Sequence, residues 1–204
     1  FTVATNAAMG VAAQVANALE MFVSNFQTAF NPQLIQSHAS KDYIAHRDLL
    51  FRASKFSYFL LLIMLVPIVS NIDFILNLWL AEVPEYTNYF IVFILISYLF
   101  NALSTPFVTS IFATGNIKGY QIALTVIFVC GLITTFSVLQ MGAKPYSVSI
   151  VSVFIQFALL LCRLYYAHNH VGVSFRRFIS DVGVPISLVT ILSIIPPCFL
   201  YSWQ

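Results

Sequence analysis

Long apolar runs constrain this chain more than any other feature. Residues 56–69 are almost wholly apolar and contain no charged side chain. A helix that crosses a bilayer needs about 20 mostly apolar residues, because each residue rises about 1.5 Å through a hydrocarbon core of about 30 Å. Six segments meet this requirement: residues 2–30, 56–80, 86–112, 120–141, 147–168 and 182–203. Backbone groups in hydrocarbon must be paired within their own segment, so we expect an all-α integral membrane protein with about six transmembrane helices.

The composition excludes several other classes of protein. Hydrophobic residues make up 60% of the chain and charged residues only 8%, whereas a soluble domain has about 25% charged residues. The net charge of +2 is too small to indicate a nucleic-acid partner. The sequence lacks the spacing of a metal centre, a phosphate-binding loop or a nucleophile elbow. We therefore expect no cofactor, no metal and no enzymatic activity.

The distribution of basic residues predicts the orientation in the membrane. Every Lys and Arg except Lys144 lies in, or at the edge of, the connections after the first, third and fifth segments. Loops rich in Lys and Arg stay in the cytoplasm. These three connections are therefore expected to be cytoplasmic, and both ends of the chain are expected to face outward.

The first segment has two chemically distinct faces. At 100° per residue its apolar side chains gather on one side and its polar ones on the other. A helix lying flat on a membrane usually has a polar face rich in Lys and Arg, and this face has none. We interpret it as a spanning helix between lipid and a watery cavity. The polar face comprises Asn6, Gln14, Asn17, Glu20, Ser24, Gln27, Thr28 and Asn31.

Glu20 is the one acid well inside an expected span. A charge at mid-bilayer costs about 2.5–3.5 kcal/mol on insertion scales, so such residues face cavities or partners. Glu20 is either a ligand or proton site, or a structural hydrogen-bonding group between helices.

Two other segments have polar rows. Ser97, Asn101, Thr105 and Thr109 follow i+4 spacing in the third segment, which favours close helix packing over cavity lining. In the fifth segment Arg163 lies about 10 Å along the axis from Gln156. Arg163 either reaches out to the lipid headgroups or contacts an anion at the inner mouth of a cavity.

Local signals predict where helices end or bend. Asn71, Asp73 and Asn77 alternate with apolar residues, so the outer half of the second segment is expected to tilt into the interface as a short amphipathic piece. Pro106 is expected to kink the third segment.

Four stretches together resemble a known family. They are AFNPQL at residues 29–34, HRDLLFRASKFSYFLLL at 46–62, LNLWLAEVPEYT at 76–87 and ATGNIKGYQI at 113–122. In order and spacing they resemble the polysaccharide-export branch of the multidrug/oligosaccharidyl-lipid/polysaccharide exporter superfamily, the O-antigen and capsule flippases of bacterial inner membranes. In that resemblance Asn31-Pro32 is a helix end and Thr114-Gly115 is a turn.

The resemblance implies a function for the whole assembly. The chain would be one lobe of a two-lobed, MATE-like transporter, roughly its C-terminal half, and would require an N-terminal transmembrane lobe. It would move polyprenyl-diphosphate-linked oligosaccharide across the bacterial inner membrane for lipopolysaccharide, O-antigen or capsule biosynthesis, with membrane lipid and the lipid-linked oligosaccharide as partners. The residues that we expect to line the substrate cavity are Gln14, Asn17, Glu20, Ser24 and Gln27, with Gln156 and Arg163 as head-group contacts.

Two other functions stay open. The first is a cation-coupled multidrug antiporter of the same superfamily, in which Glu20 exchanges protons or sodium against a cationic drug. The second is a membrane glycan polymerase or acyltransferase. The short outer connections, around residues 81–85 and 142–146, argue against it because such enzymes usually have larger outer loops.

Overall fold

The computed structural model describes residues 3–201, with backbone only for residue 194 and residues 196–201. All regular elements in this part are helical. They are α1 (Val3–Ala39), α2 (Tyr43–Ser70), α3 (Ile72–Trp79), α4 (Thr87–Ala113), α5 (Lys118–Gln140), α6 (Ser147–Val171), α7 (Phe175–Phe178), the π-helical turn η1 (Ile179–Gly183) and α8 (Val184–Tyr201). Five of the described helices, α1, α2, α4, α5 and α6, are long and apolar enough to span a membrane. The chain is an all-α, multi-pass membrane protein, as expected from the sequence.

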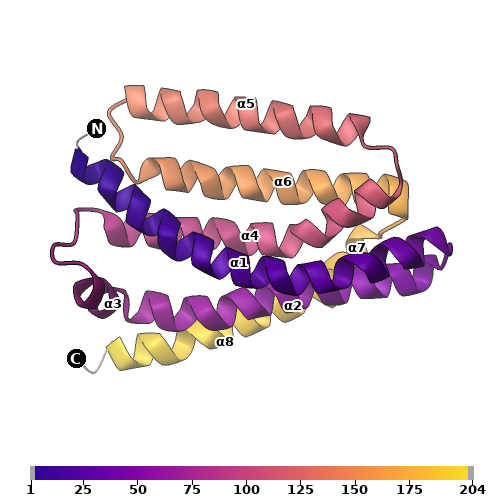
Figure 1. Ribbon diagram of the computed structural model, residues 1–204, viewed down its shortest axis with the longest axis horizontal. Helices are drawn as coiled ribbons and strands as arrows, with labels where there is room; N and C mark the ends of the chain where they lie inside the picture. Colours follow the sequence, from indigo (N-terminus) through magenta and orange to yellow (C-terminus); the bar gives the residue numbers. More distant parts are fainter. Residues whose placement is uncertain (1–2, 202–204) are drawn as a thin grey trace.

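The long helices run side by side along one axis (Figure 1). α5 packs on α6, α6 packs on α4, and α1 crosses in contact with both α4 and α2. α8 occupies the position of the sixth expected segment and returns along α2. The turns at residues 40–42, 114–117 and 172–174 gather at one end of the bundle, which we call the basic end (Figure 1). The start of α1 and the last turn of α8 lie at the opposite end, as the alternation of spans predicts.

A stripe of alanines joins α1 to α4. Ala8, Ala12 and Ala16 are fully buried and share a cluster with Phe90, Ile91 and Leu95. Between helices in a bilayer the attraction is van der Waals contact, and small side chains let the two backbones approach closely. This stripe lies on the buried side of α1. The expected lipid-facing side is only partly exposed: Phe22 is 52% exposed, whereas Val23 is buried in the other apolar cluster.

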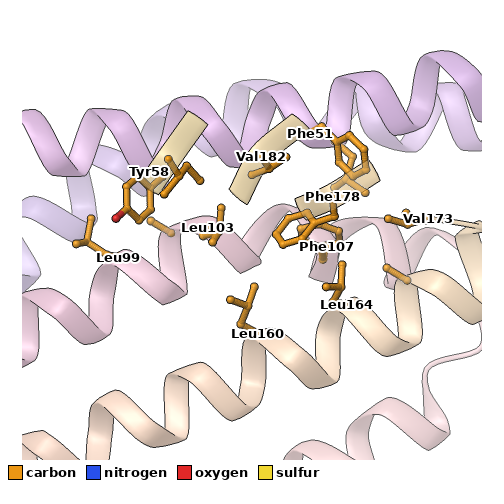
Figure 2. Packing of buried hydrophobic residues seen from close by; sticks show 14 of the residues in the cluster. Phe51, Tyr58, Leu99, Leu103, Phe107, Leu160, Leu164, Val173, Phe178 and Val182 are labelled. Atoms are coloured by element: carbon orange, nitrogen blue, oxygen red, sulfur yellow. The ribbon is translucent and has the colours of Figure 1, made fainter. Parts of the chain in front are cut away.

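A second cluster fixes the connection between α6 and α8. Phe178 of α7 meets the rings of Phe51 and Phe107 edge-on, at centroid distances of 6.1 and 5.5 Å. Figure 2 shows these rings with Leu164 and Val182 around them. Aromatic pairs favour this edge-to-face geometry because the positive ring edge meets the negative ring face. The short helix α7 is therefore firmly attached to α2 and α4.

Two boundaries differ from the sequence expectation. The expected helix end at Asn31-Pro32 is wrong, because α1 continues through Pro32 to Ala39. Proline removes one backbone hydrogen bond, but tertiary contacts hold the helix on both sides: Asn31 Oδ1 accepts from Thr109 Oγ1 at 2.9 Å, and Leu34 is fully buried. The next helix then begins early, at Tyr43, with the Asp42 side chain accepting from the Ala45 amide at 3.1 Å.

The expected break after the second long helix, the bend near Pro106 and the turn at Thr114-Gly115 are confirmed. α2 stops at Ser70, and the outer half of the expected second span forms the separate helix α3, which Figure 1 shows nearly end-on to the long helices. α4 changes direction in its second half, where Pro106 lies (Figure 1). The Thr114-Gly115 turn is present, with a positive φ of 74° that glycine adopts easily. The end of the sixth expected segment, residues 202–203, lies outside the described residues.

Candidate functional site

The polar face of α1 meets α4 near the middle of both helices. Glu20 is half-buried there, and its Oε1 accepts a hydrogen bond from Asn101 Nδ2 at 3.0 Å. The alanine stripe brings α1 close enough to α4 for these short side chains to touch. Glu20 is therefore joined to a neighbouring helix by a specific polar contact within an apolar bundle.

Asn101 also reaches a second charged residue. Its Oδ1 accepts from Arg163 Nη1 of α6 at 3.2 Å. These two partners fix the orientation of the Asn101 amide, because its NH₂ can only donate to the carboxylate and its oxygen can only accept from the guanidinium. One neutral side chain bridges an acid on α1 and a base on α6.

Arg163 lies inside the bundle, with 9% of its surface exposed. Its Nε donates to Tyr120 Oη at 3.3 Å, and Nη1 also donates to Ser104 Oγ. Within the described part of the chain, no carboxylate lies in ion-pair contact with Arg163. The interpretation of Arg163 as a side chain that extends to the headgroups is therefore wrong. Burying a guanidinium with only neutral acceptors is costly, and charged groups in such positions commonly belong to a functional site.

A small polar cavity adjoins this network. Its volume is about 110 Å³, and it lies between α1, α2 and α4. Several water molecules fit in such a space, but a whole sugar chain does not, since sites for larger ligands measure about 300–1,000 Å³. The cavity is a recess in the polar face. Its lining residues are Glu20, Val23, Ser24, Gln27, Leu61, Tyr98, Asn101, Ala102 and Thr105.

Three of the expected site residues, Glu20, Ser24 and Gln27, line this recess together. Gln27 is buried and its Nε2 donates to the Ala102 carbonyl at 2.9 Å. Asn17 is exposed one turn away and accepts from Tyr98 Oη at 3.0 Å. The edge of the polar face thus bonds to α4.

The remaining expected residues lie apart from the recess. Gln14 is exposed on α1, between the start of the helix and Glu20. Gln156 is half-buried on α6, and its Oε1 is enclosed with no hydrogen-bond partner in the described residues. The structure brings neither side chain into contact with Glu20.

Sequence reasoning missed the bridging role of α4. The polar row of α4 at i+4 spacing contributes both to cavity lining and to helix packing. Asn101 and Thr105 line the recess, while Thr109 forms a hydrogen bond from α4 to α1. The regular spacing was a usable signal for a shared face, but nothing in it singles out Asn101. No local pattern points to Tyr120 or Ser104 as neighbours of Arg163.

Comparison with protein-family models, curated proteins and solved structures finds no match to this chain. The class that the fold defines is a multi-pass helical membrane protein with a bridged acid–base pair inside the bundle.

Proposed function

We propose that the protein is a transporter of the bacterial inner membrane that translocates polyprenyl-diphosphate-linked oligosaccharide for lipopolysaccharide, O-antigen or capsule biosynthesis. The observation that carries the proposal is the polar face of α1 beside the bridge from Glu20 through Asn101 to Arg163. The family resemblance of the four sequence stretches supports the same function.

The chemistry of such a substrate matches this face. Sugar hydroxyls cannot cross hydrocarbon unpaired, because burying a polar group without a hydrogen bond costs several kcal/mol, roughly 2–7. Amide and hydroxyl side chains donate and accept in the same way as water, and α1 exposes Gln14, Asn17 and Ser24 along one side. The lipid tail of the substrate stays in the surrounding bilayer.

The buried cation favours an anionic head group. Arg163 has no carboxylate in contact, and no described residue accepts a hydrogen bond from its Nη2. A diphosphate offers the charge-assisted bonds that a guanidinium forms best. In alternating access this lobe would rock against a second one. Arg163 and Asn101 would then be the groups that interact with the negative charge of the substrate.

A second candidate function follows from the recess itself. It is small and lined by oxygen-bearing side chains with one carboxylate, Glu20, and hard cations prefer oxygen ligands. A cation-coupled multidrug antiporter would use such a site. Here a proton or sodium ion at Glu20 would exchange against a cationic drug.

Deleting the gene in its host distinguishes the flippase from the antiporter. Loss of a lipid-linked oligosaccharide flippase leaves that lipid on the cytoplasmic leaflet and reduces surface glycan. Loss of an antiporter leaves the surface glycan unchanged and slows the efflux of cationic dyes. Normal surface glycan together with normal topology of the lipid-linked oligosaccharide would contradict the first proposal.

A further inference from the structure

The basic end of the bundle carries more positive than negative side chains, although Asp42, Asp48 and Asp181 also lie there. Apart from Lys144 and the buried Arg163, every Lys and Arg of the chain belongs to elements that meet at this end. Among the described residues none of them is held in an ion pair with an acid. The charge at this end is thus available to an external partner.

One part of this surface, α7, is anchored in the apolar core. It follows Gly172, whose φ of 72° ends α6, and Val173, which is fully buried. Phe178 then anchors the helix between Phe51 and Phe107. Arg47 of α2 reaches the same place and donates from Nη1 to the Gly172 carbonyl at 3.2 Å.

The outward side of this connection is both basic and apolar. Arg176 and Arg177 are exposed, while Phe175 is 37% and Ile179 is 59% exposed beside them. The nearest acid in sequence, Asp181, accepts from the Ser180 hydroxyl at 2.8 Å and not from either arginine. Apolar groups next to fixed cations are typical of segments that lie in a membrane surface.

The depth of α7 agrees with that position. It follows the end of α6 that carries Tyr165 and Tyr166, and amphipathic rings favour the headgroup level. We propose that α7, with Arg176, Arg177 and the adjacent Arg47, is a binding surface for the phosphate groups of anionic phospholipids. This partner is independent of the proposed transport function, because it depends only on the charge and depth of the connection.

The test is a lipid titration of the full-length protein. The purified protein in neutral detergent is titrated with phosphatidylglycerol, and bound lipid is counted by native mass spectrometry. The variant R176Q/R177Q is expected to bind about fivefold more weakly for each charge removed. The charge-conserving variant R176K/R177K and the variant K144Q, at the opposite end, are expected to bind as the parent does.

Several outcomes overturn the proposal. It fails if R176Q/R177Q binds phosphatidylglycerol as tightly as the parent, if K144Q loses as much affinity, or if phosphatidylcholine binds equally well. It also fails if millimolar inorganic phosphate displaces the lipid, since the surface would then be a site for free phosphate. Should R176Q/R177Q fail to fold, the salt dependence of the parent decides: affinity that does not fall between low and high ionic strength contradicts binding through these exposed charges.

Discussion

Asn101 Nδ2 lies 3.0 Å from Glu20 Oε1, and this contact joins α4 to α1 beside the apolar cluster that the same two helices share. Because the oxygen of the same amide accepts from Arg163, Asn101 holds an acid and a base of two other helices at a fixed separation. A direct ion pair would neutralise both groups. A bridged pair leaves each group able to form further hydrogen bonds with a ligand, which is the property that a polar translocation route requires.

Replacing Asn101 by Leu should destabilise the protein. The substitution removes a partner of Glu20 and of Arg163 at once, and each polar group left unsatisfied costs about 1–3 kcal/mol. The free energy of unfolding in detergent, followed by the loss of helical circular dichroism, measures the effect. The matched control is N25L, because Asn25 is exposed on α1 and its side chain forms no hydrogen bond with the described residues. Equal stability of N101L and N25L would show that the bridge contributes nothing.

Replacing Ala12 by Leu should separate α1 from α4. Ala12 is fully buried in the alanine stripe, so three added carbons must displace the facing helix, and overpacking of this kind costs about 1–3 kcal/mol. A18L serves as the control, since Ala18 is exposed on the same helix. We expect a lower unfolding temperature for A12L only. If both variants unfold at the same temperature as the parent, α1 does not pack through this stripe.

The fold was predictable where one physical requirement dominates. Apolar length and the pairing of backbone groups were enough to place the helices and to anticipate the break that creates α3. The continuation of α1 through Pro32 was missed because the cost of a proline is visible in the local sequence, whereas the bond from Thr109 and the burial of Leu34 depend on tertiary packing. The alanine stripe has a visible i+4 signal, but hydropathy gives small residues little weight.

The site was predictable only in part, for the same reason. Amphipathicity identified Glu20, Ser24 and Gln27, which share the recess. The partners of Glu20 and Arg163 come from positions 81 and 62 residues away in sequence, respectively. A single sequence has no local feature that connects Glu20, Asn101 and Arg163, since their contacts depend on how α1, α4 and α6 pack.

Changing Glu20 should separate the two candidate functions. In E20Q the side-chain oxygen still accepts from Asn101, so oligosaccharide translocation should be only mildly reduced, whereas E20L removes the acceptor and should abolish most of it. A cation-coupled antiporter needs the negative charge, and E20Q would then be as inactive as E20L. Restoration of surface glycan by each variant in the deletion strain, at matched protein levels, is the measurement. If E20L restores the glycan fully, Glu20 has no role in the transport route.

Accessibility of α1 to water tests the two-faced helix directly. In a background without native cysteines, N17C and S24C should react quickly with a membrane-impermeant thiol reagent, because both positions are exposed on the polar side. F22C is the matched comparison: Phe22 is 52% exposed, but on the apolar side, where the neighbouring medium is hydrocarbon and a charged reagent is excluded. We expect rates for N17C and S24C at least about tenfold above that of F22C, corresponding to a free-energy difference of about 1.4 kcal/mol. Equal rates at all three positions would mean that α1 does not face water on one side and lipid on the other. The proposed polar route would then lose its structural basis.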